Sequence, residues 1–208
     1  MIQSKKIKFG GGGLSQTQTV NQNSKFGVRQ IVLCALFAAL TAVGAFIKIP
    51  VPVVPFTLQL LFSTLAGLLL GKRYGALSVL LYIVIGLIGI PVFTEGGGIQ
   101  YIFKPTFGYI IGFCLGAFVT GAIAHSVPSP SFLRLLAASF AGLVVVYVFG
   151  MVYFYLISNF VTGDAITFAK VFIYCFLLVV PGDILLCVVA AVISKRIIPV
   201  LRKRGLLW

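Results

Sequence analysis

Asp183 is a carboxylate inside a long apolar run. The free-energy cost of placing its charge there must be offset by a polar partner or a cavity. The run extends from Val171 to Ile193. A charged side chain at the centre of a membrane helix costs roughly 2.5 to 3.5 kcal/mol on insertion scales. Pro181 and Gly182 precede Asp183, so the carboxylate could open a helix and be stabilised by its dipole, or it could lie at a kink. Asp183 is therefore either a structural cap paired with a lysine or a group that receives a ligand.

A second polar segment combines glycines, aromatic residues and one cation. Residues 91–109 read PVFTEGGGIQYIFKPTFGY. Glycines permit close backbone approach, aromatic side chains form apolar walls, and a lysine can receive a ligand carboxylate. The alternative is a glycine turn with an interfacial aromatic belt and a snorkelling lysine. The binding residues expected here are Phe93, Gly97, Gly98, Gln100, Tyr101, Lys104 and Tyr109.

Thr57 and Gln59 add a third polar group, after the proline-rich sequence VPVVP. An uncharged amide both donates and accepts hydrogen bonds, so Gln59 could read a ureido or amide group. Hydrogen bonding between helices explains the same residues equally well. Tyr147 lies in a later apolar run and could stack against a ligand or pack in the core.

Several classes of chemistry find no support in these residues. The acidic residues Glu95, Asp164 and Asp183 form no cluster that would hold a divalent metal. The four cysteines lack metal or redox spacing, so we expect core residues and no disulfide. A serine nucleophile motif, a carboxylate pair and a phosphate-binding loop are missing, so we expect neither catalytic residues nor a cofactor. The net charge of +13 is scattered over segment ends, which argues against nucleic acid as a partner.

The elements that position these residues must lie in a lipid bilayer. The chain is 60% hydrophobic and 9% charged, whereas a soluble domain carries roughly 25% charged residues. A span needs about 20 apolar residues at 1.5 Å per residue. We predict an all-α integral membrane protein of about six transmembrane helices. The expected spans are approximately 31–47, 57–70, 76–92, 107–125, 135–157 and 171–194.

The distribution of lysine and arginine predicts the orientation. One side of the predicted topology, including both chain ends, carries most of these residues, whereas the other side holds only Lys48, Lys104 and Lys170. Basic loops tend to remain cytoplasmic. Both termini should then be cytoplasmic, with residues 1–30 as a flexible basic tail and residues 31–208 as a single membrane domain. The acidic residues fall on the outer side.

Small residues recur at intervals of four and permit close approach between helices. In the predicted fourth span they are Gly108, Gly112 and Gly116, and internal packing is the expected role of most such stripes. The first span is peripheral in chain order, which favours a partner surface there. The expected partner residues are Ala35 with Ala39 and Ala38 with Ala42.

The order of three motifs resembles the BioY family, the biotin-binding S components of energy-coupling-factor (ECF) transporters. The motifs are VPVVPFTLQ, GLIGIPVFTEGGGIQYIFKPTFGYIIGF and PGDILLCVVAAVISKRI, and the resemblance covers residues 31 to about 200. It implies the six-helix S-component fold in the cell membrane, with biotin near the outer face under the loop after the third span. It also implies a membrane-embedded coupling protein and two cytoplasmic ATPase subunits as partners, with the first span contacting the coupling protein.

The resemblance also implies roles for single residues. Asp183 falls on the aspartate of the family's PGD signature and should accept hydrogen bonds from the ureido nitrogens of biotin. Many members carry a lysine three residues later, where this chain has Leu186. Lys104 stands where many members have glycine, and our hypothesis is that it replaces that lysine as the partner of the biotin carboxylate.

High-affinity capture and inward delivery of biotin is thus the predicted function, without enzymatic activity. An S component for another small vitamin would keep the fold and change the ligand. A proton-coupled secondary transporter would use Asp183 as a proton relay, although inverted repeats are not visible. A membrane enzyme would need a catalytic constellation that the sequence lacks.

Overall fold

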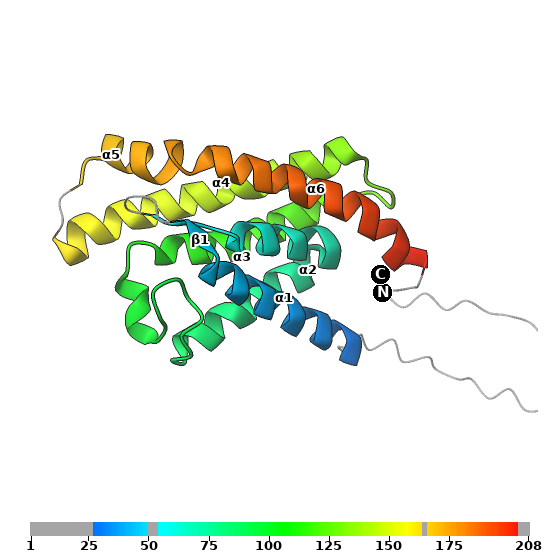
Figure 1. Ribbon diagram of the computed structural model, residues 1–208, viewed down its shortest axis with the longest axis horizontal. Helices are drawn as coiled ribbons and strands as arrows, with labels where there is room; N and C mark the ends of the chain where they lie inside the picture. The colour runs from blue at the N-terminus through cyan, green and yellow to red at the C-terminus, as the bar shows by residue number, and fades with distance from the viewer. Residues whose placement is uncertain (1–26, 50–53, 164–165, 204–208) are drawn as a thin grey trace, which may run out of the picture.

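The computed structural model describes residues 27–49, 54–163 and 166–203, and these form an elongated bundle of helices (Figure 1). Residues 1–26 of the predicted tail lie outside the described residues, and the first helix begins at Val28 rather than at residue 31. The long helices are α1 (Val28–Phe46), α2 (Gln59–Leu87), α3 (Phe107–Ala124), α4 (Phe132–Ile157) and α6 (Val180–Lys203). The short elements are β1 (Lys48–Ile49), β2 (Phe56–Thr57), η1 (Ile99–Phe103), η2 (Ser158–Thr162), α5 (Phe168–Phe172) and η3 (Ile173–Leu177).

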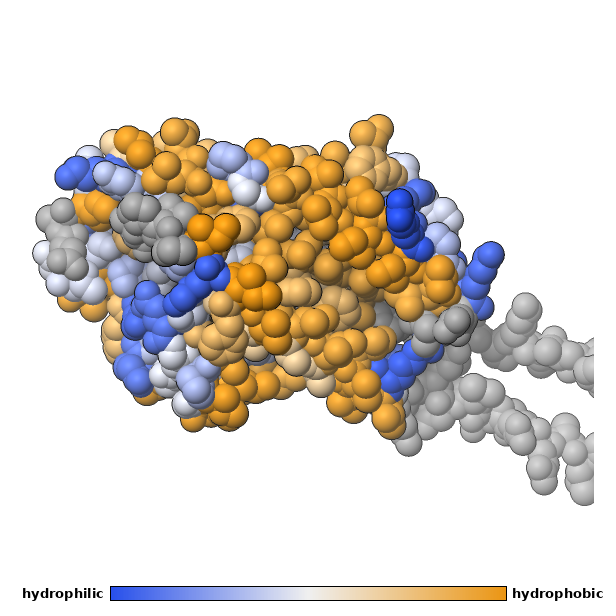
Figure 2. Space-filling model, in the orientation of Figure 1, coloured by the Kyte–Doolittle hydropathy of each residue, from blue (hydrophilic) through white to orange (hydrophobic). Residues whose placement is uncertain are grey.

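The surface of the bundle is apolar because its helices are hydrophobic on nearly all sides. Val28, Leu133 and Phe160 are each more than 70% exposed. Figure 2 shows an apolar belt around the middle, with hydrophilic residues gathered toward the two ends. A helix that is hydrophobic all round is buried in protein or in lipid. Five described helices are long and apolar enough to cross a membrane, and the prediction of an all-α membrane protein is confirmed.

Helix α2 is two helical arms joined by a sharp turn at Gly71. This residue has φ 78° and ψ 178°, a combination that is essentially restricted to glycine. The chain turns back so closely that Gly75 lies against the backbone of Ala66 and Gly67. The arms correspond to the predicted second and third spans, so the described residues contain six membrane segments when the arms are counted separately.

The last membrane segment begins with irregular helical turns. Its first part consists of α5 and the π-helical η3, and regular helix resumes at Val180. Single turns of π-helix occur frequently at functional sites. Asp183 lies in the first turn of α6, so of the two placements that the sequence left open, the helix start is correct.

Two apolar clusters fill the bundle, one at each end. The first surrounds Tyr82, Phe93 and Phe107 at the end that carries the long loops. The second surrounds Leu68 and Leu135 at the opposite end. Between them α3 packs closely on α4, because a side chain at Gly112 or Gly116 would meet the α4 backbone or Val146. The expected role of this glycine stripe in internal packing is confirmed.

Both ends of the described chain lie at the same end of the bundle. In Figure 1, α1 begins and α6 ends on one side, whereas residues 88–106 and the connection after α4 lie on the other. A chain that crosses the membrane an even number of times must begin and end on the same side of it. We call the first side the terminal end and the second the loop end; which of them faces the cytoplasm stays a prediction.

Replacing Gly71 with alanine should lower the melting temperature of the purified protein in detergent by roughly 2 to 10 °C. A Cβ atom at this φ and ψ is strained by about 1 to 3 kcal/mol. Gly163→Ala is the matched control, because Gly163 has nearly the same φ of 76° but a ψ of 4°, which lies in the left-handed region that other residues can enter. Equal losses in the two variants would contradict a special requirement at the α2 turn.

Candidate functional site

A cavity opens at the loop end, between α2, α3, α4 and α6. It holds about 630 Å³ of space that no atom fills, its open mouth included. Six residues predicted from the sequence line it: Thr57, Gln59, Tyr101, Tyr109, Tyr147 and Asp183. The predicted residues Phe93, Gly97, Gly98, Gln100 and Lys104 are not among its lining residues.

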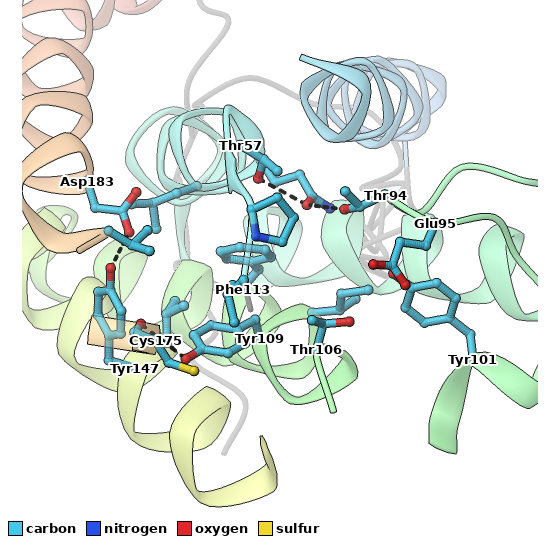
Figure 3. A pocket seen from close by; sticks show the side chains of 17 residues that line it. Thr57, Thr94, Glu95, Tyr101, Thr106, Tyr109, Phe113, Tyr147, Cys175 and Asp183 are labelled. Carbon is cyan, nitrogen blue, oxygen red and sulfur yellow. Dashed lines mark hydrogen bonds between the residues drawn. The ribbon is translucent and has the colours of Figure 1, made fainter. Parts of the chain in front are cut away.

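Asp183 forms one end of the cavity (Figure 3), and its carboxylate has a single hydrogen-bond partner among the described residues. The hydroxyl of Tyr147 donates to its Oδ2 over 2.6 Å, and the carboxylate is 8% exposed. A carboxylate offers about four acceptor positions. The described residues contain one salt bridge, between Lys104 and Glu95, so a cap paired with a lysine is not what they show. The remaining acceptor positions are available to a ligand.

Aromatic rings form the wall next to Asp183. The rings of Tyr109 and Tyr147 meet edge to face with centroids 6.2 Å apart, and Tyr147 packs in the same way on Phe176 at 4.9 Å. The Tyr109 hydroxyl donates to the carbonyl oxygen of Cys175 over 3.3 Å. This bond ties α3 to the irregular turns of η3, which holds the wall in place ahead of any ligand.

A polar corner lies across the cavity, centred on Gln59. Its Oε1 accepts from Thr57 over 3.1 Å and from Thr94 over 3.3 Å, while its Nε2 donates to the Tyr82 hydroxyl over 2.7 Å. The Tyr82 hydroxyl donates in turn to the carbonyl oxygen of Val92. The network joins both arms of α2 to the loop, and it fixes the amide while leaving it on the cavity wall. The hydrogen-bonding role between helices is therefore present at Gln59, and its role in reading a ligand stays a prediction.

Gly97 and Gly98 shape the loop behind the cavity wall. The Gly98 amide donates to the carbonyl oxygen of Gly86 over 2.7 Å, with φ 103° at Gly98. Gly97 lies against the carbonyl of Ile90. These close approaches fold the loop onto the second arm of α2, so the glycines position the wall.

Phe93 and Gln100 also lie behind the wall. Phe93 is fully buried and contacts the rings of Tyr82, Tyr101 and Phe107. The Gln100 side chain donates to the Gly97 carbonyl oxygen over 3.1 Å. In this structure Phe93 supports the lining residue Tyr101, and Gln100 stabilises the glycine turn.

Lys104 lies at the edge of the cavity rather than in its lining. Its Nζ is 2.6 Å from Oε2 of Glu95 and 5.2 Å from the ring centroid of Tyr101, and both of those residues line the cavity. Burial raises the pKa of Tyr101, so its hydroxyl remains protonated at neutral pH. Glu95 was missed as a lining residue, although it is the one acid in the glycine-rich segment.

The four predicted partner residues of α1 face in different directions. Ala35 and Ala39 are exposed. Ala38 is buried in the apolar cluster of the loop end, and Ala42 is half-buried against it. In this structure the outward surface therefore includes the first pair, whereas Ala38 is inaccessible to a partner.

The comparisons with known proteins identify the family. The profile of the BioY family matches residues 16–203. The chain belongs to the BioY family. A probable biotin transporter BioY from Lysinibacillus sphaericus is 46% identical over 172 residues, which cover 83% of this chain and 88% of the relative. The biotin transporter BioY of Thermotoga maritima is 41% identical over 171 residues, which cover 82% and 96%.

A solved structure has the same fold. The chain is similar to the crystal structure of the S-component for biotin from an ECF-type ABC transporter, with a TM-score of 0.60 and 26% sequence identity. The match covers 82% of this chain and 90% of the other. The predicted S-component fold is confirmed.

Replacing Tyr147 with phenylalanine should lower the melting temperature in detergent by roughly 3 to 10 °C. The change removes a hydrogen bond to a charged group, worth about 1.5 to 3 kcal/mol. Tyr155→Phe is the control, because Tyr155 is a half-buried tyrosine of the same helix whose hydroxyl makes no hydrogen bond to the described residues. If both variants have the same melting temperature, the hydrogen bond from Tyr147 to Asp183 does not stabilise the fold.

Proposed function

We propose that this protein captures biotin at its loop end as the substrate-binding subunit of an ECF-type uptake transporter. Its family, the names of the relatives and the matching S-component support this proposal. The observation that carries it is the buried carboxylate of Asp183 in the wall of the cavity. A chain that binds and releases its ligand needs no catalytic group.

The two ends of the cavity differ in a way that suits biotin. Asp183 offers acceptor positions at one end, and Glu95 with Tyr101 lies at the other (Figure 3). Lys104 forms an ion pair with Glu95 at that end. Biotin carries two ureido N–H donors at one end and a carboxylate at the other. Hydrogen bonds to a charged acceptor are roughly twice as strong as neutral ones. In our proposal Asp183 accepts from the ureido group, and the rings of Tyr109 and Tyr147 enclose the bicycle.

Lys104 is the proposed partner of the biotin carboxylate, and Glu95 holds it at the cavity edge. The lysine is 40% exposed in this ion pair, and Glu95 is 49% exposed. An exposed pair of this kind is worth about 0 to 1 kcal/mol, so little is lost when the ammonium turns to a ligand. Glu95 thus acts as a resting partner that keeps Lys104 near the entrance.

Inward delivery requires partners in this proposal, because the motifs of an ATPase are missing from the sequence. The family resemblance supplies a coupling protein and two cytoplasmic ATPase subunits. The exposed residues Ala35 and Ala39 on α1 offer a flat surface for the coupling protein. The distribution of lysine and arginine supports cytoplasmic termini in the cell membrane, which places the cavity on the outer side.

Replacing Asp183 with asparagine should weaken biotin binding by about 10- to 100-fold. Hydrogen bonds to a charged group contribute roughly 1.5 to 3 kcal/mol, and 1.4 kcal/mol is tenfold in affinity. Isothermal titration of the detergent-purified protein with biotin measures the effect. Lys170→Gln is the control: it removes a charge that does not line the cavity, so biotin affinity should be unchanged. Unchanged affinity in the Asp183 variant, or tighter binding of riboflavin or thiamine by the parent, would contradict the proposal.

Replacing Lys104 with alanine should weaken biotin much more than biotinamide. The amide lacks the charge that the ammonium is proposed to neutralise, so its binding should depend little on this residue. Lys170→Ala serves as a control, since Lys170 is an exposed lysine of α5 that does not line the cavity. Equal losses for the acid and the amide would refute the pairing.

A further inference from the structure

A groove with basic walls lies at the terminal end of the bundle, remote from the biotin cavity. We call it the basic groove; it is lined by Lys195, Arg202 and Lys203 together with Leu135, Ile198 and Pro199. It holds about 780 Å³ of empty space, its open mouth included. The α6 residues recur at intervals of three and four, so they share one face of that helix.

The cations of the basic groove are held in position by the connection before α4. The Lys195 ammonium donates to the carbonyl oxygen of Pro130 over 3.1 Å. The Arg202 guanidinium donates to the Ser129 hydroxyl over 3.2 Å. Lysine has three donors and arginine five, and each of these bonds uses one. The remaining donors are available to an anion.

The charges of the groove have no acidic counterpart nearby. Glu95 and Asp183 are the two acidic residues in the described part of the chain, and both line the cavity at the loop end. Arg202 also borders a neighbouring cavity that contains Lys72 and Arg73. The positive potential of this end is therefore uncompensated by the described residues, which favours an anionic occupant.

The lining of the groove is partly apolar, because Leu135, Ile198 and Pro199 lie among its cations. Figure 2 shows hydrophilic residues at this end bordering the apolar belt. A soluble anion would gain nothing from the apolar lining, whereas a phospholipid places its phosphate among cations and its acyl chains against apolar side chains.

From the cations, the missing acids and the apolar lining together, we propose that the basic groove binds the headgroup of an anionic phospholipid. Basic pockets between membrane helices bind such headgroups, and lysine or arginine residues near an anionic leaflet favour anionic lipids. The lipid belongs to the leaflet at the terminal end. Its phosphate contacts Lys195 and Arg202, and its acyl chains begin against Pro199 in the apolar part of the groove.

The test is native mass spectrometry of the full chain, with phosphatidylglycerol or phosphatidylcholine added to the detergent. The parent should retain phosphatidylglycerol at least fivefold more than phosphatidylcholine. The double variant Lys195→Gln with Arg202→Gln should lose this preference. The matched control is the double variant Arg196→Gln with Lys170→Gln, which removes two charges outside the groove. This control should keep the preference for phosphatidylglycerol. Biotin titration should be unchanged in both double variants, which shows that they are folded.

Other occupants predict different results. Equal retention of the two lipids by the parent would show that headgroup charge is irrelevant and overturn the proposal. Displacement of the lipid by the same concentration of glycerol phosphate would assign the groove to free anions. If the groove variant retains phosphatidylglycerol like the control but no longer assembles with ECF subunits, the groove is a protein-docking surface, and the lipid proposal is wrong.

Discussion

The hydrogen bond from Tyr147 to Asp183 is the constraint on which the site depends. A carboxylate inside a membrane helix bundle must be solvated by something, and one phenol satisfies only part of its capacity. The start of α6 at Val180 places the carboxylate in a first helical turn, where the helix dipole favours negative charge. The Asp183 carboxylate lines the cavity, so the acceptor positions that Tyr147 does not use could receive hydrogen bonds from a molecule in the cavity.

The rest of the loop end holds this acceptor and its surroundings in place. Gln59 and Tyr82 link the two arms of α2 to the loop through the Val92 carbonyl, and Tyr109 links α3 to the turns before α6. Each bond joins segments that are far apart in the sequence. Because these bonds join residues of the chain itself, they hold the cavity wall together, and preorganisation of this kind favours affinity.

The sequence alone predicts a feature well when a single residue or a single segment length dominates its free energy. The cost of burying Asp183 indicates a residue that lines the cavity, and the length of the apolar runs indicates the six spans. The sequence could not decide which loop residues face the cavity, since this depends on backbone contacts such as the one from Gly98 to Gly86. Phe93 has the composition of a wall residue yet lies behind the wall, and Glu95 was passed over because its pairing with Lys104 follows no helical spacing.

The turn at Gly71 has a consequence for the surrounding membrane. The arms of α2, residues 59–70 and 72–87, extend roughly 18 and 24 Å at 1.5 Å per residue, whereas the hydrocarbon layer is about 30 Å thick. This hydrophobic mismatch draws the exposed Lys72 and Arg73 below the level of the headgroups unless the lipid thins beside them. Bilayer thickness thereby becomes a variable of this protein's energetics.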